Sequence, residues 1–203
     1  QGHYENTLAN GIAWYYRNEA TPFVFRAVNR LDRDTSGLVL LAKNPYSSCV
    51  LSDAVKDHTI HREYAAIVSG KTDASGTIDL PIARKDGSTI ERVCDPERGE
   101  TAVTHYRTFA YNKDADISFI RLLLETGRTH QIRVHMKAIG HPLPGDFLYC
   151  PDYRFIDRQP LHPTYLRFSH PVTGEKLEFS ASLPEDMRKL FPDIKNPSGP
   201  VFF

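Results

Sequence analysis

The sequence predicts an α+β fold with a mixed, largely antiparallel sheet and flanking helices. Segments rich in β-forming residues outnumber segments with helical spacing of apolar residues. Most predicted strands follow one another through short turns, which favours antiparallel pairing. The chain has 203 residues, of which 40% are hydrophobic and 25% are charged, so it can bury a sizeable core. We expect a single domain over residues 1–203.

Two helices are expected in the first sixty residues. One is predicted over residues 5–18, with Asn6 or Thr7 near its start. The other is predicted over residues 44–58, where an N-cap asparagine precedes a proline that suits the first helical position. Two short helices are expected later, over residues 134–139 and 184–191.

Runs of β-forming residues predict the strands of the sheet. Two of these runs flank a polar octapeptide, RLDRDTSG, at residues 30–37. Residues 71–100 are polar and rich in turn residues, which indicates hairpins on the surface. The predicted strands lie within residues 22–28, 38–43, 62–70, 100–111, 116–127 and 163–184, the last as a hairpin that turns at residues 171–175.

Composition excludes some classes of protein and leaves others open. Lysine plus arginine equals aspartate plus glutamate at 25 each, which neither predicts nor excludes a nucleic-acid partner. No apolar run approaches the ~20 residues that span a membrane, and no signal peptide is evident. Three cysteines far apart argue against a disulfide framework or a cysteine zinc site and favour a reducing, cytoplasmic location. No long apolar seam is evident, so we expect a monomer.

The octapeptide RLDRDTSG concentrates charge between two predicted strands. Asp32 and Asp34 are two residues apart, so in an extended segment they share a face and could form an acid–base pair. The alternative is a capped turn, since aspartate, serine and threonine commonly bind nearby backbone groups in turns. Only Gly37 plainly serves the backbone. The local pattern alone favours the capped turn.

The segment TGRTHQIRVH, residues 126–135, places Arg128 and Arg133 directly after a nearly continuous apolar run. Arginine suits recognition of carboxylates and phosphates because its planar guanidinium donates two hydrogen bonds in parallel. A solvated strand edge is the alternative interpretation of the same residues. The arginines are therefore candidates for an anion-binding role.

Histidines and a tyrosine near these segments are weaker candidates. His130, His135 and His141 fall within twelve residues, but separations of five and six place them on no common face, which argues against a metal site. Tyr64 begins a predicted strand, where a tyrosine is usually a core or rim aromatic residue.

Five stretches together resemble, in order and spacing, the RluA-type family of RNA pseudouridine synthases. The resemblance covers nearly the whole chain, and the first and fourth stretches are the most specific. The stretches are RLDRDTSGLVLLAKN, REYAAIVSG, GETAVTHY, TGRTHQIRVHMKAIGHPLPGD and LHPTYLRFSHPVTGE.

This resemblance implies an enzyme that converts uridine to pseudouridine within structured RNA, either ribosomal or transfer RNA, without a metal or organic cofactor. It implies that Asp32 is the catalytic aspartate, that Tyr64 is the active-site tyrosine and that Arg133 pairs with the aspartate. It also implies an active-site cleft across the middle of the sheet. The substrate-binding positions that it implies are Arg30, Arg128, His130 and Ile132.

The chain departs from the family pattern in three places. Asn29 stands where the family usually has histidine, and Pro163 stands where alanine is common, which we interpret as a local loop variation. The family's further N-terminal strand is not found, so we expect a catalytic domain that lacks its first strand. The family's frequent S4 RNA-binding domain is also not found in this chain.

Three other functions share some of these residues. A glycoside or nucleoside hydrolase could use Asp32 with Asp34 or Asp146, because paired carboxylates also act at glycosidic bonds. A metal hydrolase could use the histidines. A non-catalytic RNA-binding module would require the catalytic residues to be lost, yet all three are present.

Overall fold

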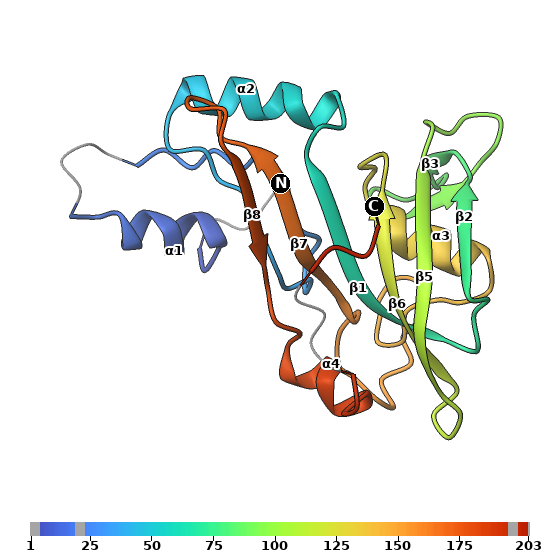
Figure 1. Cartoon of the computed structure of the whole chain (residues 1–203). Helices are drawn as coiled ribbons and strands as arrows, with labels where there is room; N and C mark the ends of the chain where they lie inside the picture. Colours follow the sequence, from blue (N-terminus) through green and yellow to red (C-terminus); the bar gives the residue numbers. More distant parts are fainter. Residues whose placement is uncertain (1–4, 19–22, 195–198, 203) are drawn as a thin grey trace. The chain divides into compact units, whose positions relative to one another are not determined.

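A six-stranded sheet organises the computed structural model, with strands in the order β2-β5-β6-β1-β7-β8 (Figure 1). The structure describes residues 5–18, 23–194 and 199–202. A separate two-stranded ribbon pairs β3 with β4. The strands are β1 (His61–Ser69), β2 (Ser75–Asp79), β3 (Ile82–Arg84), β4 (Arg92–Cys94), β5 (Val103–Asn112), β6 (Ile117–Leu124), β7 (Leu161–Ser169) and β8 (Lys176–Ser180). The helices are α1 (Leu8–Tyr15), α2 (Pro45–Lys56), α3 (Gln131–Ala138) and α4 (Glu185–Leu190).

Antiparallel pairing dominates the sheet. Strand β1 pairs antiparallel with β6 on one side and with β7 on the other. Strand β5 pairs antiparallel with β6 and with β2. The predicted α+β class with a largely antiparallel sheet is therefore confirmed.

The chain divides into two compact units. The larger unit contains residues 31–38, 61–168 and 178–203, and it includes α3, α4 and most of the sheet. The smaller unit contains residues 1–30, 39–60 and 169–177, and it includes α1 and α2. The expectation of a single domain stays a prediction.

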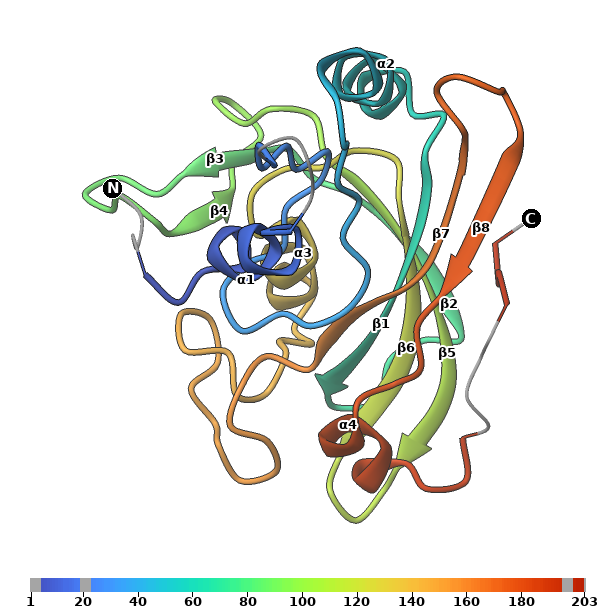
Figure 2. The same cartoon turned by 90° about the vertical axis from the view of Figure 1, so that its left-hand side faces the viewer.

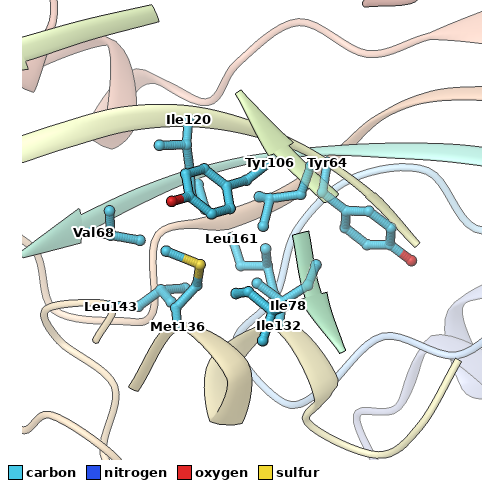
Figure 3. Close-up of a cluster of buried hydrophobic side chains, with 11 residues drawn as sticks. Tyr64, Val68, Ile78, Tyr106, Ile120, Ile132, Met136, Leu143 and Leu161 are labelled. Carbon is cyan, nitrogen blue, oxygen red and sulfur yellow. The ribbon is translucent and has the colours of Figure 1, made fainter. Parts of the chain in front are cut away.

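Strand β1 supplies the larger unit's core on both of its faces, because successive side chains of a strand point to opposite sides. Tyr64, Ala66 and Val68 face the first hydrophobic cluster, which includes Ile132 and Met136 of α3 (Figure 3). Ala65 and Ile67 face a second cluster, which includes Leu183, Met187 and Phe191 around α4. Helix α3 lies against the face of the sheet that carries Tyr64, Ala66 and Val68 (Figure 2).

Helix caps in the smaller unit follow the predicted signals. Thr7 caps α1 in a capping box with Asn10, within the helix predicted at residues 5–18. Asn44 accepts a hydrogen bond from the backbone N–H of Ser47 at 2.8 Å, and Pro45 is the first residue of α2. No helix in the described ranges is both long enough and apolar enough to cross a bilayer.

The two strands predicted beside the octapeptide are not formed, and this prediction is wrong. Residues 23–28 and 38–43 contain one isolated bridge, between Ala27 and Leu41. The N–H of Val28 donates to the carbonyl of Leu40 at 2.9 Å, and the N–H of Ala42 donates to that of Arg26 at the same distance. A pairing this short gives the β-forming residues little to pack against, so propensity alone does not make a strand. Pro22, in the same prediction, lies outside the described residues.

Most of the remaining element predictions are confirmed. Strands β5 and β6 form the predicted hairpin, β7 and β8 form the next, and β1 ends at Ser69, one residue before Gly70. Residues 71–100 contain the β3–β4 ribbon, but β2 joins the main sheet instead of forming a surface hairpin. Helix α3 begins at Gln131, three residues before the predicted start, because the turn at His130 already has a left-handed backbone that opens the helix.

Buried histidines predict that the folded protein loses stability in mild acid. Burial lowers the pKa of His130, His135 and His162 below the ordinary value of about 6.5. The unfolded chain therefore binds more protons than the folded chain below that pH, and stability falls as the pH falls through about 6.5. We expect the urea midpoint to be lower at pH 5.5 than at pH 7.5.

A variant and a control separate these histidines from general acid effects. His135 is fully buried, and its ring nitrogens contact Thr104 Oγ1 and the carbonyl of Leu80, both at 2.9 Å. His135→Gln should reduce the difference between the two pH values, whereas His58→Asn, at an exposed left-handed turn position, should retain it. Equal midpoints for the wild type at both pH values would contradict the prediction.

Candidate active site

The octapeptide loop is fixed to the start of β7 and to Gln159 just before that strand. Leu38 donates its N–H to the carbonyl of Pro163 at 3.2 Å, and Ser36 Oγ lies 2.8 Å from His162 Nδ1. The side chain of Gln159 donates to the carbonyl of Arg33 and to Thr35 Oγ1. The hydroxyls of the octapeptide thus hold the loop that carries Asp32.

Gly37 allows this loop to cross β7 closely. Its φ is +120°, and a Cβ atom there would lie 2.6 Å from the carbonyl oxygen of Pro163. The β1–β7 register shifts between Glu63 and Tyr64, which pair with Tyr165 and Pro163, so the proline lies next to a bulge. Pro163 therefore belongs to strand β7, and its interpretation as a loop variation is wrong.

Arg133 is set by the start of α3. Gln131 Nε2 donates to Thr104 Oγ1 at 3.0 Å, and Gln131 Oε1 accepts from Thr126 Oγ1 and from the N–H of Arg128. These bonds tie the first turn of α3 to β5 and to the loop before the helix. They place Arg133 one half-turn further on, where only 1% of the residue is exposed.

Arg133 joins two carboxylates. Its Nη1 donates to Asp32 Oδ2 at 3.0 Å, so the structure brings together the two residues that the sequence places 101 positions apart. Its Nε and Nη2 donate to the two oxygens of Asp146 at 2.6 and 2.7 Å. The guanidinium is thus held on one side in a bidentate pair and presents its remaining edge to Asp32.

Asp146 is the fixed member of this group. It is fully buried, and Oδ1 also accepts the backbone N–H groups of Leu148 and Tyr149 at 3.0 and 3.2 Å. Gly145 before it has a φ of +75°, and a Cβ atom there would lie 2.5 Å from the carbonyl of Ile156. By contrast, the side chain of Asp32 is 25% exposed, so it alone of the two carboxylates can reach a substrate.

The two carboxylates keep the Arg133 guanidinium charged. Burial alone would lower the pKa of Arg133, but the hydrogen bonds and charges of Asp146 and Asp32 outweigh it and raise that pKa. Tyr149 packs beside the guanidinium, with Arg133 Cζ 5.0 Å from the ring centroid. Burial raises the pKa of Tyr149 to about 12, so its hydroxyl stays protonated.

Tyr64 lies near Asp32 on the face of the sheet that α3 covers. It is 7% exposed, and its hydroxyl points away from the other labelled side chains of the hydrophobic cluster (Figure 3). Burial raises the pKa of Tyr64, and the charge of Asp32 raises it further, while Arg62 opposes the shift. At neutral pH the phenol is therefore protonated and can donate a hydrogen bond.

The other predicted site residues have different surroundings. Arg128 donates to Glu100 and to the carbonyl of Thr101, at the exposed edge of the loop before α3. His130 Nδ1 lies 2.9 Å from the hydroxyl of Tyr149. Ile132 is buried in the cluster that contains Tyr64.

Arg30 and Asn29 belong to the smaller unit. Arg30 is exposed, and Asn29 is buried with its Oδ1 accepting the N–H of Leu40 at 2.7 Å. Asn29 thus has a structural partner within its own unit.

The three histidines that suggested a metal site have separate partners. His130 contacts Tyr149, His135 contacts Thr104 and Leu80, and His141 Nδ1 lies 2.8 Å from the carbonyl of Ser69. Among the described residues, no three or more side chains of histidine, cysteine, aspartate or glutamate are arranged to hold a metal ion.

Comparison with known proteins identifies the family. A family model described as RNA pseudouridylate synthase matches residues 3–138. The chain belongs to this family. The RluA-type pseudouridine synthase family predicted from the five sequence stretches is thereby confirmed.

Curated members of the pseudouridine synthase family match most of the chain. It is 46% identical over 189 residues to the uncharacterized RNA pseudouridine synthase YjbO of Bacillus subtilis. It is 39% identical over 210 residues to the ribosomal large subunit pseudouridine synthase D of Zymomonas mobilis. The two alignments cover 93% and 94% of this chain but 66% and 64% of those proteins, so the chain spans less than two thirds of their length.

Solved structures of pseudouridylate synthases share the fold. The human RNA pseudouridylate synthase domain containing protein 1 has a TM-score of 0.71 and 27% identity, and the alignment covers 83% of this chain and 73% of that one. The human RNA pseudouridylate synthase domain containing protein 4 has a TM-score of 0.69 and 20% identity, and the alignment covers 91% of this chain and 82% of that one. The second likeness is one of fold alone.

Proposed function

We propose that this pseudouridine synthase family member isomerises uridine to pseudouridine in structured RNA, with Asp32 as the nucleophile or base. The observation that carries the proposal is the contact of 3.0 Å between Asp32 and a guanidinium that Asp146 already holds from the other side. Family membership indicates the reaction. The ion pair with Arg133 holds the Asp32 carboxylate in place for it.

Asp32 needs only its charge and its orientation for this reaction. The reaction breaks the N1–C1′ bond of uridine, forms a C5–C1′ bond and releases the proton from C5. The carboxylate attacks C1′, displaces the uracil and is then displaced by C5, or it removes a proton at C2′ as the uracil leaves, or it adds to C6 of the uracil before the N1–C1′ bond breaks and is eliminated at the end. Each route requires an ionised carboxylate. Arg133 holds and orients this carboxylate through the hydrogen bond of 3.0 Å that its Nη1 donates to Asp32 Oδ2. Arg133 itself cannot drift, since two further hydrogen bonds fix it on Asp146.

Tyr64 suits a base that has left its stack. Extruding a base takes a few kcal/mol, and stacking on an aromatic ring recovers about 1–3 kcal/mol. The ring of Tyr64 lies within the electrostatic reach of Asp32, and its hydroxyl is protonated at neutral pH. We therefore assign to Tyr64 the role of receiving the uracil and donating a hydrogen bond.

The RNA that we propose as substrate is ribosomal or transfer RNA. Several relatives are named for the ribosomal large subunit, which makes that RNA the first to test. Arg30, Arg128, His130 and Ile132 remain the proposed substrate-binding positions, with Arg128 at an exposed loop edge where it can reach a phosphate. The zero net charge of the chain then predicts a local rather than a global attraction for RNA.

The hydrolase alternative fits the site less well. Asp146 is fully buried with both oxygens bound to Arg133, so it offers no free carboxylate to a water molecule. Asp34 Oδ2 lies 3.4 Å from Arg33 Nε, and this ion pair is exposed on the loop. A synthase and a hydrolase also differ in product, because only the hydrolase releases free uracil.

The reaction product tests the proposed function. The chain is incubated with transcripts of large-subunit ribosomal RNA and transfer RNA that contain 5-tritiated uridine. We expect tritium release from at least one transcript, pseudouridine among its nucleosides after digestion, no free uracil and no loss of rate with chelator. Free uracil would favour the hydrolase, and inhibition by chelator would favour the metal enzyme. Absence of any tritium release would contradict the proposal.

A further inference from the structure

Phe147 lies beside the ion-pair group and faces solvent. It is 40% exposed, although Asp146 before it is fully buried and Tyr149 after it is 6% exposed. Single exposed apolar side chains are common on proteins, so exposure alone indicates nothing. What calls for an explanation is that this exposed ring lies near two guanidinium groups.

Two arginines lie near the ring of Phe147. Arg133 Cζ lies 5.6 Å from its centroid, and Arg133 contacts Asp32 on its other edge. Arg33 Cζ lies 5.7 Å from the same centroid, and Arg33 is the neighbour of Asp32 in sequence. The exposed ring therefore lies beside the guanidinium that binds Asp32, the carboxylate that we propose as the nucleophile.

The backbone under Phe147 is held firmly. Cys150 donates its N–H to the carbonyl of Asp146 at 2.9 Å, and the Asp146 side chain binds the N–H groups of Leu148 and Tyr149. A rigidly held aromatic ring binds a flat partner with little loss of side-chain entropy. The side chain of Arg33 is 76% exposed and pairs with Asp34 at 3.4 Å, Nε to Oδ2. Because this pair is in solvent and contributes little, a phosphate can bind the same guanidinium.

We propose that Phe147 is a stacking site for a nucleobase that flanks the target uridine, with Arg33 binding the adjoining phosphate. This inference rests on the proposed function, because it takes the occupant to be RNA bound at Asp32. Aromatic rings beside cationic side chains are the usual platform for single-stranded nucleic acid. Tyr64 is buried and suits the extruded uracil, whereas the exposed Phe147 suits a base that stays outside.

An alternative role for Phe147 is to cover Arg133 from water, and leucine separates the two roles. Phe147→Leu keeps an apolar cover but removes the flat ring. We expect it to raise KM for the tritiated transcript about tenfold, about 1.4 kcal/mol, with kcat and melting temperature unchanged. Phe147→Trp should retain the wild-type KM. Tyr153→Leu is the matched control, because Tyr153 is 49% exposed in the same loop region. A wild-type KM in Phe147→Leu, or an equal rise in Tyr153→Leu, overturns the proposal.

Fluorescence tests the stacking without relying on turnover. The sequence has a single tryptophan, Trp14, so Trp14→Phe/Phe147→Trp carries one reporter at the proposed site. We expect a single-stranded RNA decamer, with purines on both sides of a central uridine, to quench this fluorescence. Trp14→Phe/Tyr153→Trp should be quenched much less. Equal quenching at both positions, or none at the first, overturns the proposal. This measurement stands even if no transcript releases tritium, so failure of the stacking site and failure of the proposed function are told apart.

Discussion

Replacing Asp32 with asparagine is expected to lower turnover of tritiated RNA at least about a hundredfold, which corresponds to about 2.7 kcal/mol in the activation free energy. Asparagine keeps the shape of the side chain but loses the charge that every candidate mechanism needs. The fold should survive the change, because Arg133 keeps its bidentate pair with Asp146 and the Asp32 side chain is partly solvated. Tritium release and thermal melting are measured on the same preparation.

Asp34 provides the matched control for Asp32. Its φ is +65°, a left-handed conformation that asparagine tolerates better than most residues, so Asp34→Asn should fold normally. Its side chain pairs with Arg33 in solvent, where such pairs contribute about 0–1 kcal/mol. We expect near-normal turnover for Asp34→Asn. If Asp32→Asn retained more than a tenth of the wild-type rate, or Asp34→Asn lost it, the assignment of the nucleophile would be wrong.

Signals that act within a few residues were enough to predict much of the fold. The N-cap asparagine and following proline fixed the start of α2, and turn residues between two apolar runs marked the β5–β6 hairpin. The same reasoning failed at residues 22–28 and 38–43. There β-forming residues pair only with each other at one bridge, and strand formation depends on neighbours that a local pattern does not name.

The residues of the candidate site were also predicted only in part. The family resemblance named Asp32, Tyr64 and Arg133, and the structure brings Asp32 within hydrogen-bond distance of Arg133. It did not assign a role to Asp146, although the fourth stretch ends on that residue. The structure shows why a second carboxylate is needed: Arg133 has 1% of its surface exposed, and one partly solvated aspartate does not balance its buried charge. The location of that second carboxylate required the fold.

Asp146 is expected to matter as much for stability as for turnover. Asp146→Asn retains an oxygen that can accept the N–H groups of Leu148 and Tyr149 but removes the charge that balances buried Arg133. Breaking a buried pair by removing one partner typically costs about 3–5 kcal/mol. We expect a loss of that size in the free energy of unfolding from urea denaturation. The remaining folded protein should also turn over slowly, because the guanidinium that orients Asp32 has lost its anchor.

A double-mutant cycle distinguishes this pairing from a general packing defect. Arg133→Met leaves the Asp146 carboxylate buried without its cation, so it should destabilise the fold to a similar degree. In Arg133→Met/Asp146→Asn no buried charge is left unpaired in this group, and the loss should be smaller than the sum of the two single losses by about 1–3 kcal/mol. The double variant should nevertheless stay inactive, since Asp32 then has no guanidinium to hold it. Additive losses in stability would show that Asp146 and Arg133 are not energetically coupled. Recovery of turnover together with stability would show that Asp32 does not need the guanidinium.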